Sequence, residues 1–143
     1  MRANVFIFSI FIFSIVLASL GFLLSTAVLA DEEKPYTVQC NGDKCKVDKK
    51  TYIGWRQFHA TCHVCHGQDA VGTTIAPNLV EKLKQIDKER FMDVVHNGYK
   101  GQIGVMPAWK DDPNVNKYFE EFYAYLKARS DGVLGPGRPE RIK

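Results

Sequence analysis

The chain has 143 residues and a formal net charge of +3, with 45% hydrophobic and 24% charged residues. So small a charge excludes nucleic-acid binders that depend on a strongly basic surface, and it predicts weak long-range steering toward charged partners. The apolar residues are concentrated at the start, because residues 3–30 contain no charged side chain. Residues 31–143 are enough for one domain.

Residues 1–30 are predicted to be an export signal. Arg2 gives a short positive start, a long apolar stretch follows, and Ala30 ends a run of small and aliphatic side chains suited to cleavage after it. An uncleaved membrane anchor is the alternative, because about 20 apolar residues are enough to span a bilayer. Either way we expect the domain in the periplasm, with membrane contact only if residues 1–30 are retained.

Residues 31–47 are predicted to be an N-terminal extension that contains a small β-hairpin. Asn41 and Gly42 form a turn signal, and short strand-like segments flank them. Cys40 and Cys45 lie on either side of this turn. In an oxidising compartment we expect them to form a disulfide; the alternative is a pair of reduced thiols.

Apolar residues at spacings of three and four predict an all-α domain over residues 48–132. Asp48, Asp87 and Asp112 are expected to cap helices. The predicted helical stretches, joined by long loops, are 48–63, 79–83, 87–98 and 112–131. Residues 133–143 are rich in Gly, Pro and Arg, and we expect them to be a flexible tail.

Such short helices and long loops enclose little core by themselves, and small domains usually need an additional cross-link or cofactor. Cys62-His63-Val64-Cys65-His66 supplies one, because Cys-x-x-Cys-His is the attachment signature for c-type haem. We expect Cys62 and Cys65 to form thioethers with one haem. The adjacent His66 is then the expected proximal iron ligand.

Two other interpretations of these cysteines remain open. Cys40, Cys45, Cys62 and Cys65 have a spacing close to that of a four-cysteine zinc site, although zinc would leave His66 without a role. A lone Cys-x-x-Cys can also be a redox-active dithiol, although the βαβ context of such proteins is absent here.

The sixth iron ligand decides between an electron carrier and an enzyme. Met106 is our candidate, because it lies in a loop after the motif and Pro107 stiffens the backbone beside it. Met92 fits helix packing better, and His96 is the rival ligand. A His/Met pair leaves no open position for substrate and raises the reduction potential. We therefore expect a one-electron carrier and no enzyme activity.

At these residues the chain resembles a class I cytochrome c over most of residues 48–130. Gly54 and Phe58 lie before the motif where that family places its N-terminal helix contacts. Phe122 and Tyr125 match the aromatic side of its C-terminal helix. The resemblance implies an all-α fold in which the N- and C-terminal helices cross around a covalently bound haem, with Gly54 allowing their close approach.

The same resemblance implies a haem environment. Pro77 matches the family proline whose carbonyl accepts the Nδ1–H bond of the proximal histidine, here His66. Tyr99 and Trp109 match aromatic positions that often approach a haem propionate. Ordinary core packing is the alternative for each of these residues.

A closer resemblance, carried by residues 47–55, 62–67 and 125–132, is to periplasmic cytochromes of methylotrophic and alcohol-oxidising bacteria. It implies a monohaem carrier that accepts electrons from a quinoprotein (PQQ) methanol or ethanol dehydrogenase and passes them toward a terminal oxidase or another cytochrome. The alternatives are a general respiratory carrier between a bc1-type complex and an oxidase, or a haem enzyme or gas sensor with open coordination. We expect a monomer.

Overall fold

A computed structural model describes residues 33–102 and 104–143 of the chain. The predicted export signal therefore lies outside the described residues. Residues 34–143 make up one compact unit. In the part of the chain that the structure describes, every helix is too short or too polar to span a bilayer.

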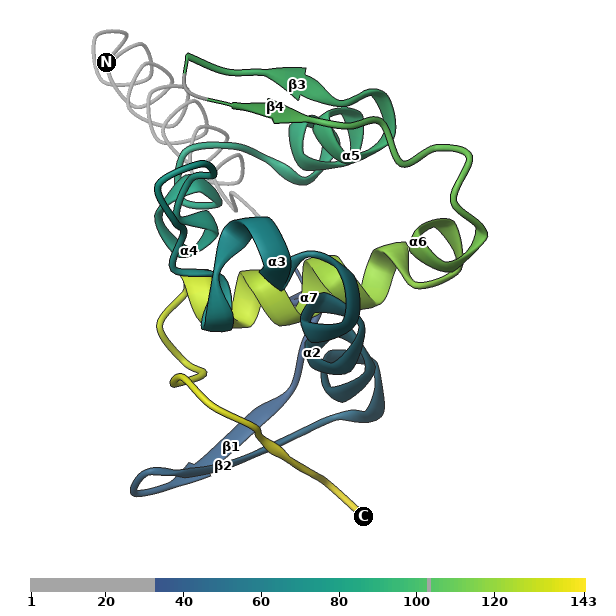
Figure 1. The fold of residues 1–143 in the computed structure, drawn as a ribbon. Helices are drawn as coiled ribbons and strands as arrows, with labels where there is room; N and C mark the ends of the chain where they lie inside the picture. The colour runs from purple at the N-terminus through teal and green to yellow at the C-terminus, as the bar shows by residue number, and fades with distance from the viewer. Residues whose placement is uncertain (1–32, 103) are drawn as a thin grey trace, which may run out of the picture. The chain divides into compact units, whose positions relative to one another are not determined.

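The described chain is mainly helical (Figure 1). Its helices in chain order are α2 (Lys49–Thr61), α3 (His63–His66), the 3₁₀ turn η1 (Gln68–Ala70), α4 (Leu79–Lys82), α5 (Lys88–Asn97), α6 (Pro113–Lys117) and α7 (Phe119–Ser130). Its strands are short: β1 (Val38–Asn41), β2 (Lys44–Val47), β3 (Tyr99–Lys100), β4 (Val105–Met106) and β5 (Glu140–Arg141).

The three expected N-caps are confirmed. The side chain of Asp48 accepts a hydrogen bond from the main-chain N–H of Thr51 at 2.9 Å, which fixes the start of α2. Asp87 caps α5 in the same way. Asp112 accepts from two main-chain N–H groups at the start of α6, where Pro occupies the first turn.

Helices α2 and α7 cross closely near the centre of the molecule (Figure 1). A Cβ atom added at Gly54 would lie 1.9 Å from the carbonyl oxygen of Glu121 and 2.9 Å from the Cβ atom of Tyr125. The ring centroids of Phe58 and Tyr125 are 5.5 Å apart across the same crossing. Gly54 is therefore the residue that permits this approach.

The core surrounds the crossing. Its buried side chains come from the N-terminal segment, most of the helices and the C-terminal segment, and include Tyr36, Val47, Phe58, Leu83, Phe91, Val115, Phe119, Phe122, Tyr125, Leu126 and Leu134. Neighbouring rings in this core meet at tilted angles, as aromatic pairs prefer.

The predicted helix 112–131 is two helices, which corrects the sequence-based expectation. Tyr118 has φ −113° and ψ 23°, outside the helical range, and it separates α6 from α7. Its N–H lies within hydrogen-bonding distance of two carbonyls, those of Asn114 and Val115, as often happens at a helix end. The apolar stripe continues across the break, so the side-chain pattern alone does not reveal it.

The N-terminal extension contains the expected hairpin. Strands β1 and β2 are antiparallel, with Cys40 opposite Cys45 in the register. The two cysteines are joined by a disulfide with an S–S distance of 2.05 Å.

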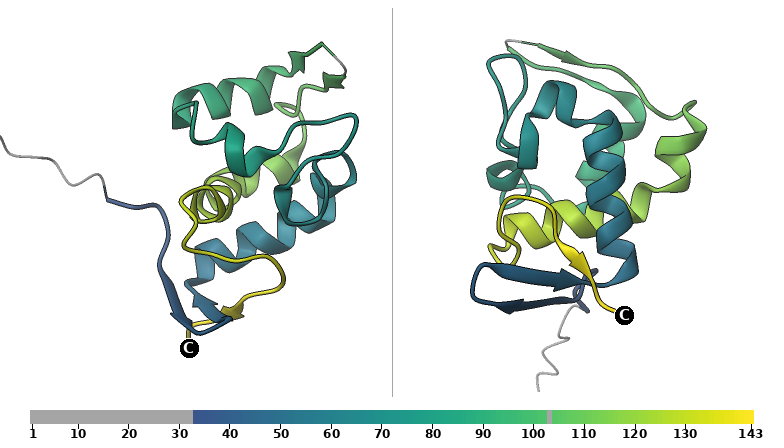
Figure 2. Two further views of the ribbon diagram at one scale, coloured as in Figure 1. Left: turned by 90° about the vertical axis from the view of Figure 1, so that its left-hand side faces the viewer. Right: turned by 60° about the horizontal axis from the view of Figure 1, so that its bottom comes forward.

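The expectation of a flexible tail over residues 133–143 was wrong. Strand β5 pairs in parallel with β2 and completes a three-stranded sheet, which both views of Figure 2 show beside the hairpin. Leu134 is only 3% exposed and fills the core. The N–H of Ile142 donates to the carbonyl of Val47 at 2.9 Å. The burial of Leu134 and the pairing of β5 with the edge of β2 order this segment, although its Gly and Pro content predicted a flexible tail.

Candidate functional site

The two motif cysteines lie at the junction between α2 and α3. Cys62 keeps the helical conformation as it ends α2 and begins α3, with its N–H bonded to the carbonyl of Phe58 at 2.8 Å. The N–H of His66 in turn bonds to the carbonyl of Cys62 at 3.0 Å. Residues three apart in a helix share a face, so Cys62 and Cys65 are neighbours. Both are free thiols, Cys62 partly buried and Cys65 exposed.

The environment of these cysteines argues against the two alternative chemistries. Burial, with a smaller contribution from Cys65, raises the pKa of the Cys62 thiol to about 12. A redox-active dithiol needs a lowered thiol pKa. Cys40 and Cys45 are joined to each other and so are not thiolate ligands for zinc. In the described ranges, no group of three or more His, Cys, Asp or Glu side chains has an arrangement that could hold a metal.

His66 is buried, with 7% of its surface exposed. Its Nδ1 lies 3.2 Å from the carbonyl oxygen of Pro77, an acceptor, so the hydrogen bond assigns the proton to Nδ1. Burial lowers the pKa of His66, and the bond to Pro77 opposes this shift only in part. The imidazole is therefore neutral at neutral pH, with the lone pair of Nε2 available for a metal.

The loop 67–77 is bonded back onto the motif. The N–H of Gly72 donates to the carbonyl of His66 at 2.7 Å, and the hydroxyl of Thr73 donates to the carbonyl of Cys65 at 2.6 Å. No sequence signal points to Thr73, because a threonine in a loop belongs to no periodic pattern or motif that would mark it.

Met106 lies in β4, which pairs with β3 so that Met106 stands opposite Tyr99. Two glycines allow the surrounding backbones to meet. A Cβ atom at Gly98 would lie 2.7 Å from the carbonyl oxygen of Met106, and one at Gly104 would lie 2.5 Å from that of Ile75. The structure thus brings the loop that follows the motif into contact with the segment that carries the candidate sixth ligand.

The other candidate residues have different surroundings. Trp109 is partly buried against the core, and its main-chain N–H donates to the carbonyl of Val95 at 3.0 Å. Tyr99 is exposed, and the guanidinium carbon of Arg90 lies 5.7 Å from the centre of its ring. The rival ligand His96 packs its ring 4.7 Å from that of Phe119, and Met92 packs against the core.

Exposed apolar side chains are concentrated in three segments: the motif, the loop 67–77 and the loop 99–110 that carries Met106. Among the described residues, six large apolar side chains are exposed, and all but Val133 belong to these segments: Val64, Val71, Ile75, Tyr99 and Val105. Val64, inside the motif, is 72% exposed. Large exposed apolar surfaces mark binding sites. A haem fits this site, because the chain offers two free thiols and a buried, oriented imidazole next to each other.

Comparisons with known proteins identify similar cytochromes. Residues 50–126 match the family described as cytochrome c oxidase, cbb3-type, subunit III. The chain is 39% identical over 100 residues to cytochrome c-553I of Paracoccus denitrificans, covering 66% of this chain and 44% of that protein. It is 33% identical over 96 residues to cytochrome c-555 of Methylococcus capsulatus, covering 66% of this chain and 75% of that protein.

A solved structure is similar as well. The crystal structure of the c-type cytochrome XoxG from Methylobacterium extorquens AM1 matches with a TM-score of 0.68 and 41% sequence identity, covering 80% of this chain and 77% of that one. This match confirms the mainly helical fold with crossed terminal helices that the resemblance implied. The chain spans less than half the length of cytochrome c-553I.

Proposed function

This chain belongs to the c-type cytochrome family that includes subunit III of the cbb3-type cytochrome c oxidase, and from this membership we propose that it carries single electrons in the periplasm. It is a monohaem c-type cytochrome with covalently bound haem c. The observation that best supports haem attachment is the buried His66, oriented by Pro77 directly beside two free thiols, and Met106 as the second ligand is what would make the chain a carrier. When bound, the haem supplies an iron that changes between the ferrous and ferric states.

The proposed roles follow from the chemistry of each side chain. Cys62 and Cys65 hold the haem through thioethers. His66 coordinates through Nε2, while its Nδ1–H bond to the Pro77 carbonyl fixes the ring plane and increases its basicity. Met106 would supply a thioether sulfur as the second iron ligand, and such a ligand would favour the ferrous state. Two protein ligands leave no position for substrate, so this chain exchanges electrons and does not act as an enzyme.

The proposed electron donor is a quinoprotein (PQQ) methanol or alcohol dehydrogenase. Support comes from the sequence blocks shared with cytochromes of methylotrophic bacteria and from relatives in Methylococcus capsulatus and Methylobacterium extorquens. The proposed acceptor is a terminal oxidase or another cytochrome. Val64, Val71 and Val105 are exposed beside the site, so we expect the donor to dock on an apolar surface with little help from the small net charge.

Stopped-flow mixing of the oxidised holoprotein with substrate-reduced quinoprotein methanol dehydrogenase tests this function. We expect fast reduction that saturates with dehydrogenase concentration. Val64→Glu should slow reduction several-fold, because it places a charge in the apolar contact. Val133→Glu is the matched control, since Val133 is exposed but lies outside the motif and its loops. Slow, non-saturating reduction, with fast reduction by a bc1-type complex, would favour the general respiratory carrier.

A further inference from the structure

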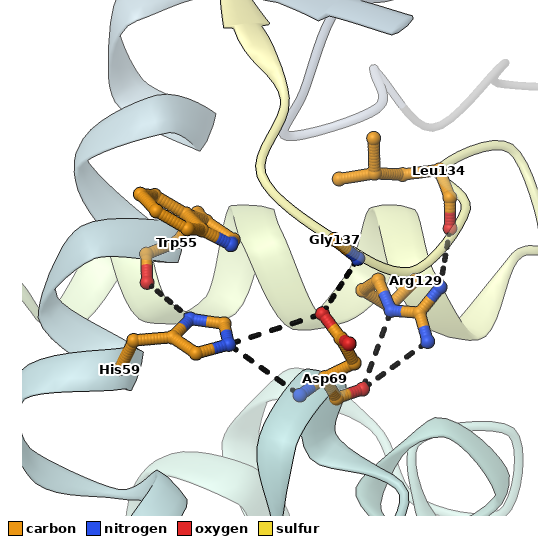
Figure 3. Close-up of polar contacts among 6 residues, drawn as sticks. All are labelled: Trp55, His59, Asp69, Arg129, Leu134 and Gly137. Atoms are coloured by element: carbon orange, nitrogen blue, oxygen red, sulfur yellow. Dashed lines mark hydrogen bonds and ion pairs between the residues drawn. The ribbon is translucent and has the colours of Figure 1, made fainter. Parts of the chain in front are cut away.

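Asp69 is the residue at which the C-terminal segment 133–143 meets the loop that follows the haem-attachment motif (Figure 3). It lies in η1, shortly after His66. Its carboxylate accepts a hydrogen bond from the main-chain N–H of Gly137 at 2.8 Å. Its main-chain carbonyl accepts from Nε and Nη2 of Arg129 at 3.3 and 3.2 Å. Helix α7 and the C-terminal segment are thereby both tied to one residue.

Arg129 strengthens this connection because it is buried. It is 8% exposed, and its Nη1 donates to the carbonyl of Leu134 at 2.8 Å. Hydrogen bonds from a charged donor are stronger than neutral ones, and a buried donor that loses its partner is costly. One guanidinium therefore holds both the turn at Asp69 and the start of the C-terminal segment.

Helix α2 reaches Asp69 from the other side (Figure 3). Nδ1 of His59 lies 2.8 Å from the carbonyl of Trp55 and donates to it. Nε2 of His59 is then an acceptor, and it receives the main-chain N–H of Asp69 at 3.4 Å. The carboxylate of Asp69 lies 3.8 Å from the same nitrogen. Three separate parts of the fold thus converge on Asp69.

These contacts hold an unusual backbone conformation. Asp69 and Ala70 have φ values of 58° and 65°, in the left-handed region that residues other than glycine seldom adopt. Such conformations persist where surrounding contacts over-determine them, and they are common at functional sites. Ala70 is fully buried, so the turn directs its methyl group into the core.

The turn at Asp69 constrains the rest of the loop 67–77. The loop is attached to His66 at two further points: the N–H of Gly72 bonds to its carbonyl at 2.7 Å, and the carbonyl of Pro77 lies 3.2 Å from its Nδ1. Because Gly72 and Pro77 of this loop both contact His66, the place where Asp69 is fixed limits where the Pro77 carbonyl can lie.

We propose that Asp69 is a positioning residue for His66. It transmits the anchoring by Arg129 and the C-terminal segment to the loop 67–77, and thereby keeps the carbonyl of Pro77 on the imidazole. This inference deepens the proposed function, and rests on it for the role of His66 as an axial ligand.

The exchange of the His66 Nδ1 proton with solvent, followed by NMR in the haem-loaded protein, tests this role. In Asp69→Ala the acceptor for the Gly137 N–H is lost, and we expect exchange at least about tenfold faster. Asp69→Asn keeps an oxygen acceptor and should exchange at nearly the original rate. Asp131→Ala is the matched control. Asp131 ends α7 and accepts a hydrogen bond from the hydroxyl of Tyr36, so the substitution lowers stability without removing a contact to the loop 67–77.

A chain that ends at Pro136 provides a second test, which still applies if Asp69→Ala fails to retain haem. It lacks Gly137, so we expect the same acceleration as in Asp69→Ala. Combining the two changes should add little to the exchange rate, because both remove the hydrogen bond between Gly137 and Asp69, although the shortened chain also loses the pairing of β5 with β2. The inference would be overturned by unchanged exchange in Asp69→Ala or in the shortened chain, by equal acceleration in Asp131→Ala, or by fully additive effects.

The proposed function and this inference fail separately. The exchange rate reports how well the Pro77 carbonyl holds the imidazole, whichever side chain binds the iron on the opposite face. The axial-ligand resonances of His66 in the same spectra test the ligand assignment. Unshifted His66 ring resonances would contradict that assignment while leaving the exchange comparison valid.

Discussion

The positions of the candidate haem residues in the fold could be predicted from the sequence for some of them and not for others. Cys62, Cys65 and His66 lie in one continuous helical stretch, so their spacing along the chain is also their spacing in space. Met106 depends on the pairing of β3 with β4, two strands too short to be recognised from residue pattern. Asp69 carried no sequence signal, because its contacts come from residues distant in the chain.

Replacing Met106 by Ala should keep the haem, since both thioethers and His66 remain, but lower the reduction potential, because the sulfur that favours ferrous iron is lost. A spectroelectrochemical titration measures this. Met92→Ala is the matched control: Met92 packs against the core, so its loss should cost about 2 kcal/mol of stability and leave the potential nearly unchanged. An unchanged potential in Met106→Ala would count against Met106 as ligand.

At the scale of elements, features that depend on neighbouring residues were predicted from the sequence, and features that depend on contacts between distant segments were not. The caps at Asp48, Asp87 and Asp112 were predictable, because a cap is made by residues within one turn. The break at Tyr118 and the pairing of β5 with β2 were not. The pairing of β5 with β2 joins segments that the sequence places far apart, and the break at Tyr118 interrupts an apolar stripe that continues across it.

The crossing of α2 and α7 should be sensitive to one methyl group. In Gly54→Ala the added carbon would overlap the carbonyl of Glu121, so the helices must separate. We expect a loss of about 3 kcal/mol in the free energy of unfolding, measured by guanidinium denaturation of the holoprotein. Gly135→Ala is the control, because a Cβ atom there meets nothing within 4 Å. Equal stability of the two variants would contradict the close crossing.

The cap of α2 predicts a pH dependence. Burial acts to raise the pKa of Asp48, but hydrogen bonds from Thr51 and Thr37 outweigh it, so the pKa lies below its usual value of 3.8. A carboxyl with a depressed folded pKa stabilises the fold above its unfolded pKa, and this contribution is lost as the pH falls through the folded value. Stability should therefore fall below about pH 4.

Asp48→Asn keeps a cap oxygen but does not titrate, so its melting temperature should fall less steeply than that of the unchanged chain on acidification. Asp48→Ala should cost about 1 kcal/mol at neutral pH. Thermal unfolding across the acid range measures both variants. Parallel curves for the unchanged chain and Asp48→Asn would show that Asp48 does not contribute to the pH dependence.

At the scale of the whole molecule, the buried core draws on most of the helices, whereas the exposed large apolar side chains of the described residues are concentrated in a few segments. The crossing of α2 and α7, the disulfide-linked hairpin and β5 form a closed structure. The exposed apolar side chains lie almost entirely on the motif and its two loops. The sequence predicted that side chains alone would not form a complete core. The exposed apolar residues show that the motif and its two loops are the segments left uncovered by protein.

We propose that the protein holds the iron on both sides, so that this cytochrome carries electrons and does not bind substrate. The visible spectrum of the purified, reduced holoprotein with and without carbon monoxide tests it most directly. A six-coordinate His66/Met106 centre predicts a c-type haem spectrum that carbon monoxide leaves unchanged. Rapid formation of a carbon monoxide complex at neutral pH would contradict the claim and point to an enzyme or gas sensor with open coordination.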